Sequence, residues 1–339
     1  MVIAEPPASK VRPARPPVGS NPVTNERQVE MTTKPSHKVG VFMPCFNLGE
    51  YVEEAVESLY AQTFQDFHLL LADDASTDAR TVEVVERISR PRCDVHFETD
   101  NLGLVEISNK YMQRLDAEYI VLFNADDRLH PEFLDAQVAY LDAHPEIAAV
   151  SVSVQEFGDS DNLIEYDDSR SDLPFMLVEN RFSGAALMRK NAWLAAGMHD
   201  PDPDLYPNLD YDLWLSMLAK GMKLGTIPQA LFYWRVRKSS LSHDMDAERM
   251  RVFRRALLRK YSDLYREHAE FVTGFLLDEL ARFEQFYLDT TEAKAWLVDQ
   301  YETHLALSQT LSEEVEVLKL QLAATRPSLL AKVATRLRG

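Results

Sequence analysis

The sequence predicts an α/β fold in which a mostly parallel sheet carries helices on both faces. From residue 38 onward, short apolar segments alternate with segments whose apolar residues recur at helical spacing. Repeated strand–helix–strand units require parallel strands whose crossover helices cover the sheet. Ligands bind such sheets beyond the carboxyl ends of the strands, so we expect the functional site at that edge.

The expected elements alternate regularly in the first half of the chain and less regularly in the second. Strands are predicted at 38–43, 67–72, 93–98, 118–123, 147–154 and 230–236. Helices are predicted at 49–62, 81–89, 105–115, 131–143, 191–197, 211–221 and 246–288. The helix at 131–143 is expected to begin at Pro131, because proline is favoured at the first helical position.

The length and the N-terminal composition suggest how the chain is divided. With 339 residues, the chain can form one large domain with appendages or two modest domains. Residues 1–37 hold seven of the 17 prolines and few large apolar residues, which is typical of a disordered arm. We therefore expect an α/β domain over 38–245, followed by a helical extension over 246–290.

Charge and cysteine content exclude several classes of function. The formal net charge of −18 argues against nucleic acid as a partner, because binding phosphates requires a basic face. Cys45 and Cys93 form neither a disulfide framework nor a metal-knuckle spacing, which favours a reducing compartment. The sequence has no apolar run of about 18 residues and no signal-peptide core. We expect a cytoplasmic protein, either free or peripheral at the inner face of the membrane.

Two patterns near the C-terminus predict interaction surfaces. Within 291–325, apolar or aromatic residues fill six of the eight positions that follow alternating four-three spacing from Leu297 to Leu322. This spacing predicts a coiled coil and a homo-oligomer, while a long helix packed on its own domain remains an open alternative. Residues 326–339 form a basic amphipathic pattern, typical of a helix on an anionic membrane surface or on a partner. A solvated terminus is the alternative there.

The first of three acidic clusters follows the second predicted strand. In "LLLADDASTD", capping of the next helix requires only one of Ser76, Thr77 and Asp78. Asp73 and Asp74 are left unexplained by capping. A carboxylate at a strand end can accept hydrogen bonds from a base N–H or a ribose hydroxyl, which suggests a nucleotide.

The second cluster is "NADD", which contains Asp126 and Asp127 at the end of another apolar strand. Hard divalent cations that carry phosphates take one or two protein carboxylates and leave other positions to phosphate oxygens and water. One aspartate can therefore ligate a metal while the other holds a ribose hydroxyl. Helix capping is the alternative, but His130 and Pro131 already mark the helix start further on.

The third cluster, "NLDYDLW", contains Asp210 and Asp212 at the start of a predicted helix. Either acid can serve as an N-cap or as a partner of the helix dipole. A carboxylate held there can equally take a proton from an acceptor hydroxyl. Spacing alone leaves both interpretations open.

In this order the clusters resemble the family 2 glycosyltransferases of the GT-A fold. The resemblance covers 38–245 and is carried by "VGVFMPCFNLGEYVEEAVESLYAQTFQDFHLLLADDASTD", "DNLGLVEISN", "YIVLFNADDRLHPEFL", "SGAALMRKNAWLAAGMHD", "LDYDLWLSMLAKG" and "YWRVRKSSLSH". It implies a Rossmann-like nucleotide-diphospho-sugar transferase domain. The signature and transmembrane helices of processive synthases are missing, which favours transfer of one sugar at a time.

The resemblance implies an inverting, metal-dependent transfer from a nucleotide-diphosphate sugar to a hydroxyl of a glycan, glycolipid or protein, in surface polysaccharide or glycan assembly. The divalent cation would be Mn²⁺ or Mg²⁺. Asp210 would be the catalytic base and Asp127 a metal ligand, with His243 as a further metal or diphosphate contact. The implied nucleotide-sugar-binding residues are Pro44, Phe46, Asn47 and Glu50 near the base, Asp74 at the base or ribose, Asp126 at the ribose or sugar, and Arg235 and Arg237 at the diphosphate.

Two positions depart from the family pattern. Leu209 precedes the implied base where the family usually has glutamate, and Ser108 stands where many members have arginine. These departures keep open an alternative, a degenerate glycosyltransferase-like scaffold that binds through its C-terminal helices. Nucleotidyl transfer and dinucleotide oxidoreduction are disfavoured because the required glycine-rich loops are missing after the strands. Specificity is expected from the loops 156–182 and 198–208.

Overall fold

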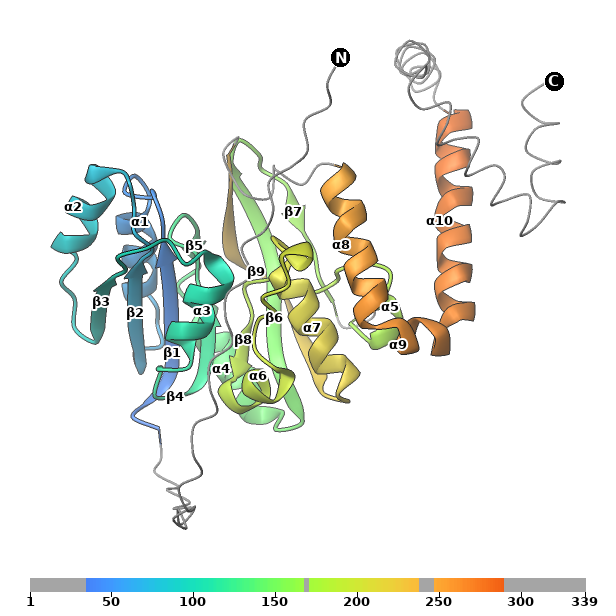
Figure 1. Cartoon of the computed structure of the whole chain (residues 1–339). Helices are drawn as coiled ribbons and strands as arrows, with labels where there is room; N and C mark the ends of the chain where they lie inside the picture. Colours follow the sequence, from blue (N-terminus) through green and yellow to red (C-terminus); the bar gives the residue numbers. More distant parts are fainter. Residues whose placement is uncertain (1–34, 168–170, 238–246, 290–339) are drawn as a thin grey trace, which may run out of the picture. The chain divides into compact units, whose positions relative to one another are not determined.

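A computed structural model describes residues 35–167, 171–237 and 247–289 (Figure 1). Its strands are β1 (His37–Cys45), β2 (Phe67–Asp73), β3 (Cys93–Phe97), β4 (Ala117–Leu122), β5 (Arg128–Leu129), β6 (Ile147–Gly158), β7 (Leu163–Ile164), β8 (Leu187–Arg189) and β9 (Lys223–Val236). Its helices are α1 (Val52–Tyr60), α2 (Ala79–Arg87), α3 (Leu104–Met112), α4 (Phe133–Ala143), α5 (Leu173–Met176), α6 (Lys190–Ala196), α7 (Leu209–Ala219), α8 (Ala247–Lys260), α9 (Ser262–Glu267) and α10 (Ala269–Asp289).

The strands form one sheet in the order β3-β2-β1-β4-β8-β6-β9-β5, with β7 paired to β6 (Figure 1). The long ladders β2–β3, β1–β2, β1–β4 and β6–β9 are parallel. The antiparallel pairings involve the short strands β5, β7 and β8. The prediction of a mostly parallel sheet is confirmed. The short strands were not predicted, because two or three residues carry no measurable periodicity.

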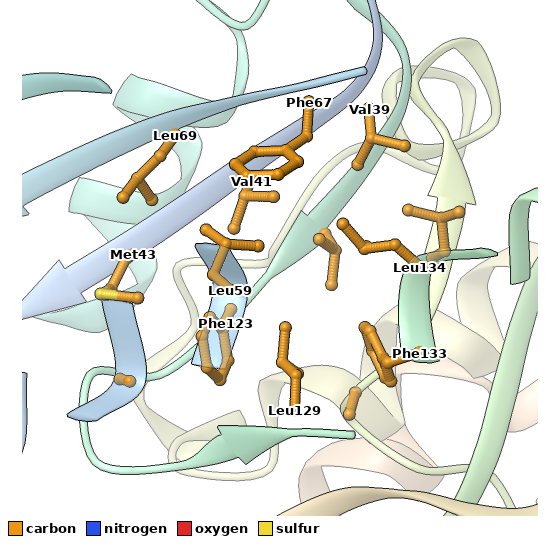
Figure 2. Packing of buried hydrophobic residues seen from close by; sticks show 14 of the residues in the cluster. Val39, Val41, Met43, Leu59, Phe67, Leu69, Phe123, Leu129, Phe133 and Leu134 are labelled. Carbon is orange, nitrogen blue, oxygen red and sulfur yellow. The ribbon is translucent and has the colours of Figure 1, made fainter. Parts of the chain in front are cut away.

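Side chains of β1 alternate between two hydrophobic cores, one on each face of the sheet. Val41 and Met43 join a cluster with buried residues of α1, α2 and α4. Figure 2 shows Val41, Leu59, Phe123 and other members of this cluster packed together. Phe42 points to the opposite face, into a cluster with α3, α6, α7 and α8. Both faces of the sheet are therefore covered, as predicted for an α/β domain.

The start of α4 differs from the sequence prediction, because α4 begins at Phe133 and not at Pro131. The main-chain N–H and the hydroxyl of Thr63 both donate to the carbonyl oxygen of Pro131, at 2.8 and 3.1 Å. A helix beginning at Pro131 would use that carbonyl to accept a hydrogen bond from a main-chain N–H one turn further on. Anchoring of the loop to Thr63 thus delays the helix.

The prediction of one amphipathic helix over 246–288 is wrong, because the described part of this segment forms α8, α9 and α10. The chain leaves helical geometry at Tyr261 (φ −109°, ψ 29°) and again at His268 (φ −101°, ψ 21°). The hydroxyl of Tyr261 donates to the Asp212 carboxylate at 2.8 Å. Fixing this side chain on α7 is the physical reason for the first break.

The exposed face of α10 is strongly apolar. Leu276, Leu280 and Phe283 are each more than half exposed. They stand three heptads before Leu297, Tyr301 and His304, in the same four-three spacing as the predicted coiled coil. The predicted segments 291–325 and 326–339, and the arm 1–37 apart from its last three residues, lie outside the described residues. Within the described ranges, no helix is long and apolar enough to span a membrane.

Candidate active site

A cleft of about 860 Å³ opens beyond the carboxyl ends of β1, β2 and β4, at the edge of the sheet where the site was expected. The start of α7 and the second half of β9 line its other side. The predicted site residues that line it are Pro44, Phe46, Asn47, Asp74, Asp126, Asp127, Asp210 and Arg237. Glu50 and Arg235 are absent from the lining described for this cleft. His243 lies outside the described residues.

Asn47 joins the loop after β1 to the loop after β2. Its backbone has a φ of 55°, a conformation that asparagine tolerates better than most residues. Its side-chain oxygen accepts hydrogen bonds from the main-chain N–H groups of Thr77 (2.9 Å) and Asp78 (3.0 Å). The main-chain N–H of Asn47 donates to the Ser76 hydroxyl. The amide therefore fixes the wall of the cleft, and the neighbouring Phe46 ring is left 42% exposed beside it.

Asp74 is held at the N-terminus of α3. Its Oδ1 accepts from the N–H of Leu102 (2.8 Å) and its Oδ2 from the N–H of Gly103 (2.9 Å). The positive end of the helix dipole stabilises a carboxylate there, and each oxygen retains a second lone pair for a ligand. Gly103 has a φ of 77°, which glycine adopts without strain. The adjacent Asp73 is buried, accepts from the N–H of Ser76 and does not line the cleft.

Asp127 is only 2% exposed, in the turn that follows β4. Its Oδ1 accepts from the main-chain N–H of Arg235 (2.9 Å) and its Oδ2 from the Asn124 amide (3.3 Å). Burial, and then the neighbouring Asp126 charge, raise the pKa of Asp127 well above its usual value. Asp126 pairs with the Arg237 guanidinium, at 2.7 Å from Nη2 and 3.2 Å from Nε.

The chemistry of this turn fits a hard divalent cation that arrives with a diphosphate. A cation relieves both causes that disfavour ionised Asp127, its burial and the repulsion from Asp126. In the described part of the chain, no group of three or more His, Cys, Asp or Glu side chains can hold a metal. A site with one or two protein carboxylates, completed by phosphate oxygens and water, is the arrangement that Mg²⁺ usually takes.

Asp210 lies in the first turn of α7 and lines the cleft. Burial raises the pKa of Asp210, while hydrogen bonds from the main-chain N–H groups of Tyr211 and Asp210 and from the Asn180 side chain act in the opposite direction. Gly184 packs directly against this carboxylate, because a Cβ at that position would stand 3.0 Å from its Oδ2. The glycine thus provides the space in which the carboxylate sits.

Asp212, two residues further along α7, has a different environment. It is buried and accepts from Lys260 Nζ at 2.7 and 2.9 Å, besides the Tyr261 hydroxyl. These contacts attach α8 to α7. The sequence left open whether these acids stabilise a helix or take a proton from an acceptor. In the structure Asp210 lines the cleft, whereas Asp212 joins two helices.

The cleft also contains residues that the sequence did not single out. Tyr166, Asn180 and Tyr206 come from the loops expected to set specificity, and Trp234 comes from β9. No motif identifies the three loop residues, because their segments lack regular spacing, whereas Trp234 lies in "YWRVRKSSLSH" but was given no role. The residues that depart from the family pattern also separate. Leu209 lines the cleft, whereas Ser108 is fully buried and away from it.

Comparison with known proteins identifies the class. Residues 40–198 match the family model described as glycosyl transferase family 2. The amylovoran biosynthesis glycosyltransferase AmsE of Erwinia amylovora is 28% identical over 188 residues, covering 54% of this chain and 69% of AmsE. The putative teichuronic acid biosynthesis glycosyltransferase TuaG of Bacillus subtilis is 21% identical over 219 residues, covering 60% of this chain and 81% of TuaG.

A solved structure shows the same fold. S. aureus TarS residues 1–349, in complex with UDP-GlcNAc, superpose with a TM-score of 0.57 at 18% identity, covering 76% of this chain and 77% of TarS 1–349. The sheet, the position of the cleft and the match to the family model all point to the same class of protein. Residues 40–198 therefore form a glycosyltransferase family 2 domain with the GT-A fold, which confirms the family and fold predicted from the sequence.

Proposed function

We propose that this chain transfers a single sugar, with inversion, from a nucleotide-diphosphate sugar to an acceptor hydroxyl, and that it requires Mn²⁺ or Mg²⁺. The observation that supports this most strongly is that two carboxylates of separate elements, the buried Asp127 after β4 and the half-buried Asp210 on α7, line one cleft. The first suits a cation that carries the donor, and the second suits proton removal from the acceptor.

The donor nucleotide is bound on the β1–β2 side of the cleft. Pro44, Phe46 and Asn47 bound the space for the base, and Asp74 accepts hydrogen bonds from the base or ribose. Asp126 contacts the ribose or the sugar. Because Asn47 and Asp74 are already fixed by main-chain N–H groups, this side is organised before the ligand arrives.

The diphosphate lies over the turn that follows β4. Asp127, with the diphosphate oxygens, would hold the divalent cation, which would neutralise charge on the leaving diphosphate. Arg237 is the only lysine or arginine in the described lining of the cleft. It rests on Asp126 and can transfer part of its hydrogen bonding to the diphosphate. A bidentate guanidinium is well suited to phosphate oxygens.

Asp210 acts as general base on the acceptor side. The acceptor hydroxyl loses its proton to the Asp210 carboxylate and its oxygen attacks the anomeric carbon. The bond from that carbon to the diphosphate oxygen breaks, and the diphosphate leaves with the electron pair. Attack on the face opposite the leaving group inverts the anomeric configuration. Burial moves the pKa of Asp210 upward, toward working pH, which improves proton transfer as long as the group stays ionised.

The acceptor is proposed to be a growing surface polysaccharide or a glycolipid. Support comes from the relatives AmsE and TuaG, which are named for amylovoran and teichuronic acid biosynthesis. Tyr166, Tyr206 and Trp234 give the cleft that Asp210 lines exposed or half-buried aromatic rings, and such rings suit the apolar face of a sugar. The protein acceptor and the membrane contact of residues 326–339 remain predictions.

The test is a screen of nucleotide sugars by thermal shift with Mn²⁺, followed by NMR of the product. We expect one donor to raise the melting temperature, and the product to carry the anomeric configuration opposite to that of the donor. A retained configuration would refute inversion. A protein that binds a donor but neither hydrolyses nor transfers it would support the degenerate-scaffold alternative.

A further inference from the structure

Arg235 holds both residues of the two-aspartate turn although it does not line the cleft. Its main-chain N–H donates to Asp127 Oδ1 at 2.9 Å. Its Nε donates to the carbonyl oxygen of Asp126 at 2.7 Å. Arg235 therefore attaches the turn that contains Asp127 to β9, and the position of the Asp127 carboxylate depends on where Arg235 lies.

Glu54 of α1 holds the other end of the Arg235 side chain. Its Oε2 accepts from Arg235 Nη2, and its Oε1 accepts from Arg128 Nη1 at 3.0 Å. The Arg235 guanidinium also lies over two rings, 4.7 Å from the Tyr51 centroid and 4.3 Å from that of Phe157. Cation–π contacts and the ion pair thus fix a side chain that is only 15% exposed.

The charges around this arginine explain why the glutamate matters. Asp126 and Asp127 are close enough to attract a guanidinium that Glu54 no longer holds, because Arg235 already bonds to both residues of the turn. A guanidinium pairs readily with both oxygens of a carboxylate. If it paired with Asp127 in this way, it would occupy the oxygens that a cation needs.

We infer that Glu54, outside the cleft, is a positioning residue for the cation site: by neutralising Arg235 it keeps the Asp127 carboxylate free and correctly placed for a divalent cation. This inference rests on the proposed function, in which Asp127 holds that cation. It also gives different roles to Arg235 and Arg237, which were both predicted to contact the diphosphate. Arg237 faces the cleft and its diphosphate, whereas Arg235 organises the turn from behind.

The test compares Glu54→Gln, Arg235→Gln and their double variant with wild type. The readout is the Kd for Mn²⁺, measured by EPR with UDP or GDP, whichever stabilises wild type more. We expect Glu54→Gln to weaken Mn²⁺ binding about tenfold, a typical cost of losing a residue that orients a metal ligand. In the Arg235→Gln background the same change should have almost no further effect, because Glu54 acts through Arg235.

Glu53→Gln is the matched control. It makes the same charge change in the same helical turn, but the Glu53 side chain is exposed and forms no ion pair with another described residue. We expect it to leave Mn²⁺ binding unchanged. With Glu54→Gln, saturating Mn²⁺ should restore kcat to within about threefold, given a tenfold weaker site. A general loss of structure would not be rescued by cation.

Asp127→Asn separates the inference from the proposed function. If Glu54→Gln binds Mn²⁺ like wild type while Asp127→Asn has lost binding, the role of Glu54 is refuted and the cation site stands. If Asp127→Asn still binds Mn²⁺ normally, the proposed cation site fails and the inference fails with it. Should Glu54→Gln not fold, Arg235→Lys tests the same arrangement, since one ammonium keeps the charge but cannot replace both Nη2 at Glu54 and Nε at the Asp126 carbonyl. Unchanged Mn²⁺ binding in a folded Arg235→Lys would also overturn the inference.

Discussion

Asp210 and Asp212 differ by two positions on α7, and the same substitution at each should give opposite results. Asp210→Asn removes the proposed base but keeps its shape in the space beside Gly184. We expect kcat to fall about 10²–10⁴-fold, the usual contribution of a general base, which is about 2.7–5.4 kcal/mol of transition-state stabilisation. The Kd for the donor nucleotide should stay within about twofold, because the lost group acts on the acceptor.

The effects on stability should have the opposite order, because Asp212→Asn should lower the melting temperature and Asp210→Asn should not. Burial disfavours ionised Asp210, so removing its charge should leave the melting temperature unchanged or higher. Burial raises the pKa of Asp212 as well, but Asp212→Asn also weakens the charge-assisted hydrogen bonds to Lys260 that attach α8 to α7. Bonds to charged groups contribute about 1.5–3 kcal/mol, which corresponds to a fall of about 3–12 °C in Tm for a domain of this size.

The assay is turnover with the donor found by thermal shift, alongside calorimetry of both variants. The assignment would be refuted if Asp210→Asn retained near-normal kcat. It would equally be refuted if Asp212→Asn lost turnover with no loss of stability, because that result would make Asp212 the base. If Asp210→Asn lowered the Tm more than Asp212→Asn, the structural role assigned to Asp212 would belong to Asp210 instead.

Two further predictions concern the Asn180 side chain and the exposed leucines of α10. Asn180→Ala removes a hydrogen bond that lowers the pKa of Asp210. Because the ionised form is the base, the acid limb of the kcat–pH profile should move to higher pH. A limb that stays in place or moves to lower pH would contradict this contact. Leu276→Lys combined with Leu280→Lys should convert an oligomer to a monomer in light scattering, because these exposed side chains continue the predicted heptad seam. Leu258→Lys, an exposed leucine on α8, is the control, and a wild-type monomer would refute the prediction of self-association.

The sequence predicted the sheet and the edge of it where the cleft lies because both depend on local patterns. A buried strand needs an apolar run, so acids directly after it, such as Asp74 and Asp127, stand out against that run. The parallel order of the strands then brings their ends together. That is why residues 50 or more positions apart in the sequence could be assigned to one site before the fold was known.

What the sequence could not predict depends on tertiary contacts. Arg235 was expected at the diphosphate, but whether a guanidinium turns toward the cleft or toward Glu54 is decided by partners 181 residues away. The delayed start of α4 depends on Thr63, and the break at Tyr261 depends on Asp212. Local propensity contains none of these contacts.

The measurement that tests the central claim most directly is release of nucleoside diphosphate from nucleotide sugars, by wild type and by Asp127→Asn, with Mn²⁺ and with EDTA. We predict that wild type releases diphosphate from one donor only when the cation is present, and that Asp127→Asn releases almost none under either condition. Release that persists in EDTA and in Asp127→Asn would contradict a cation-dependent transferase built on that aspartate.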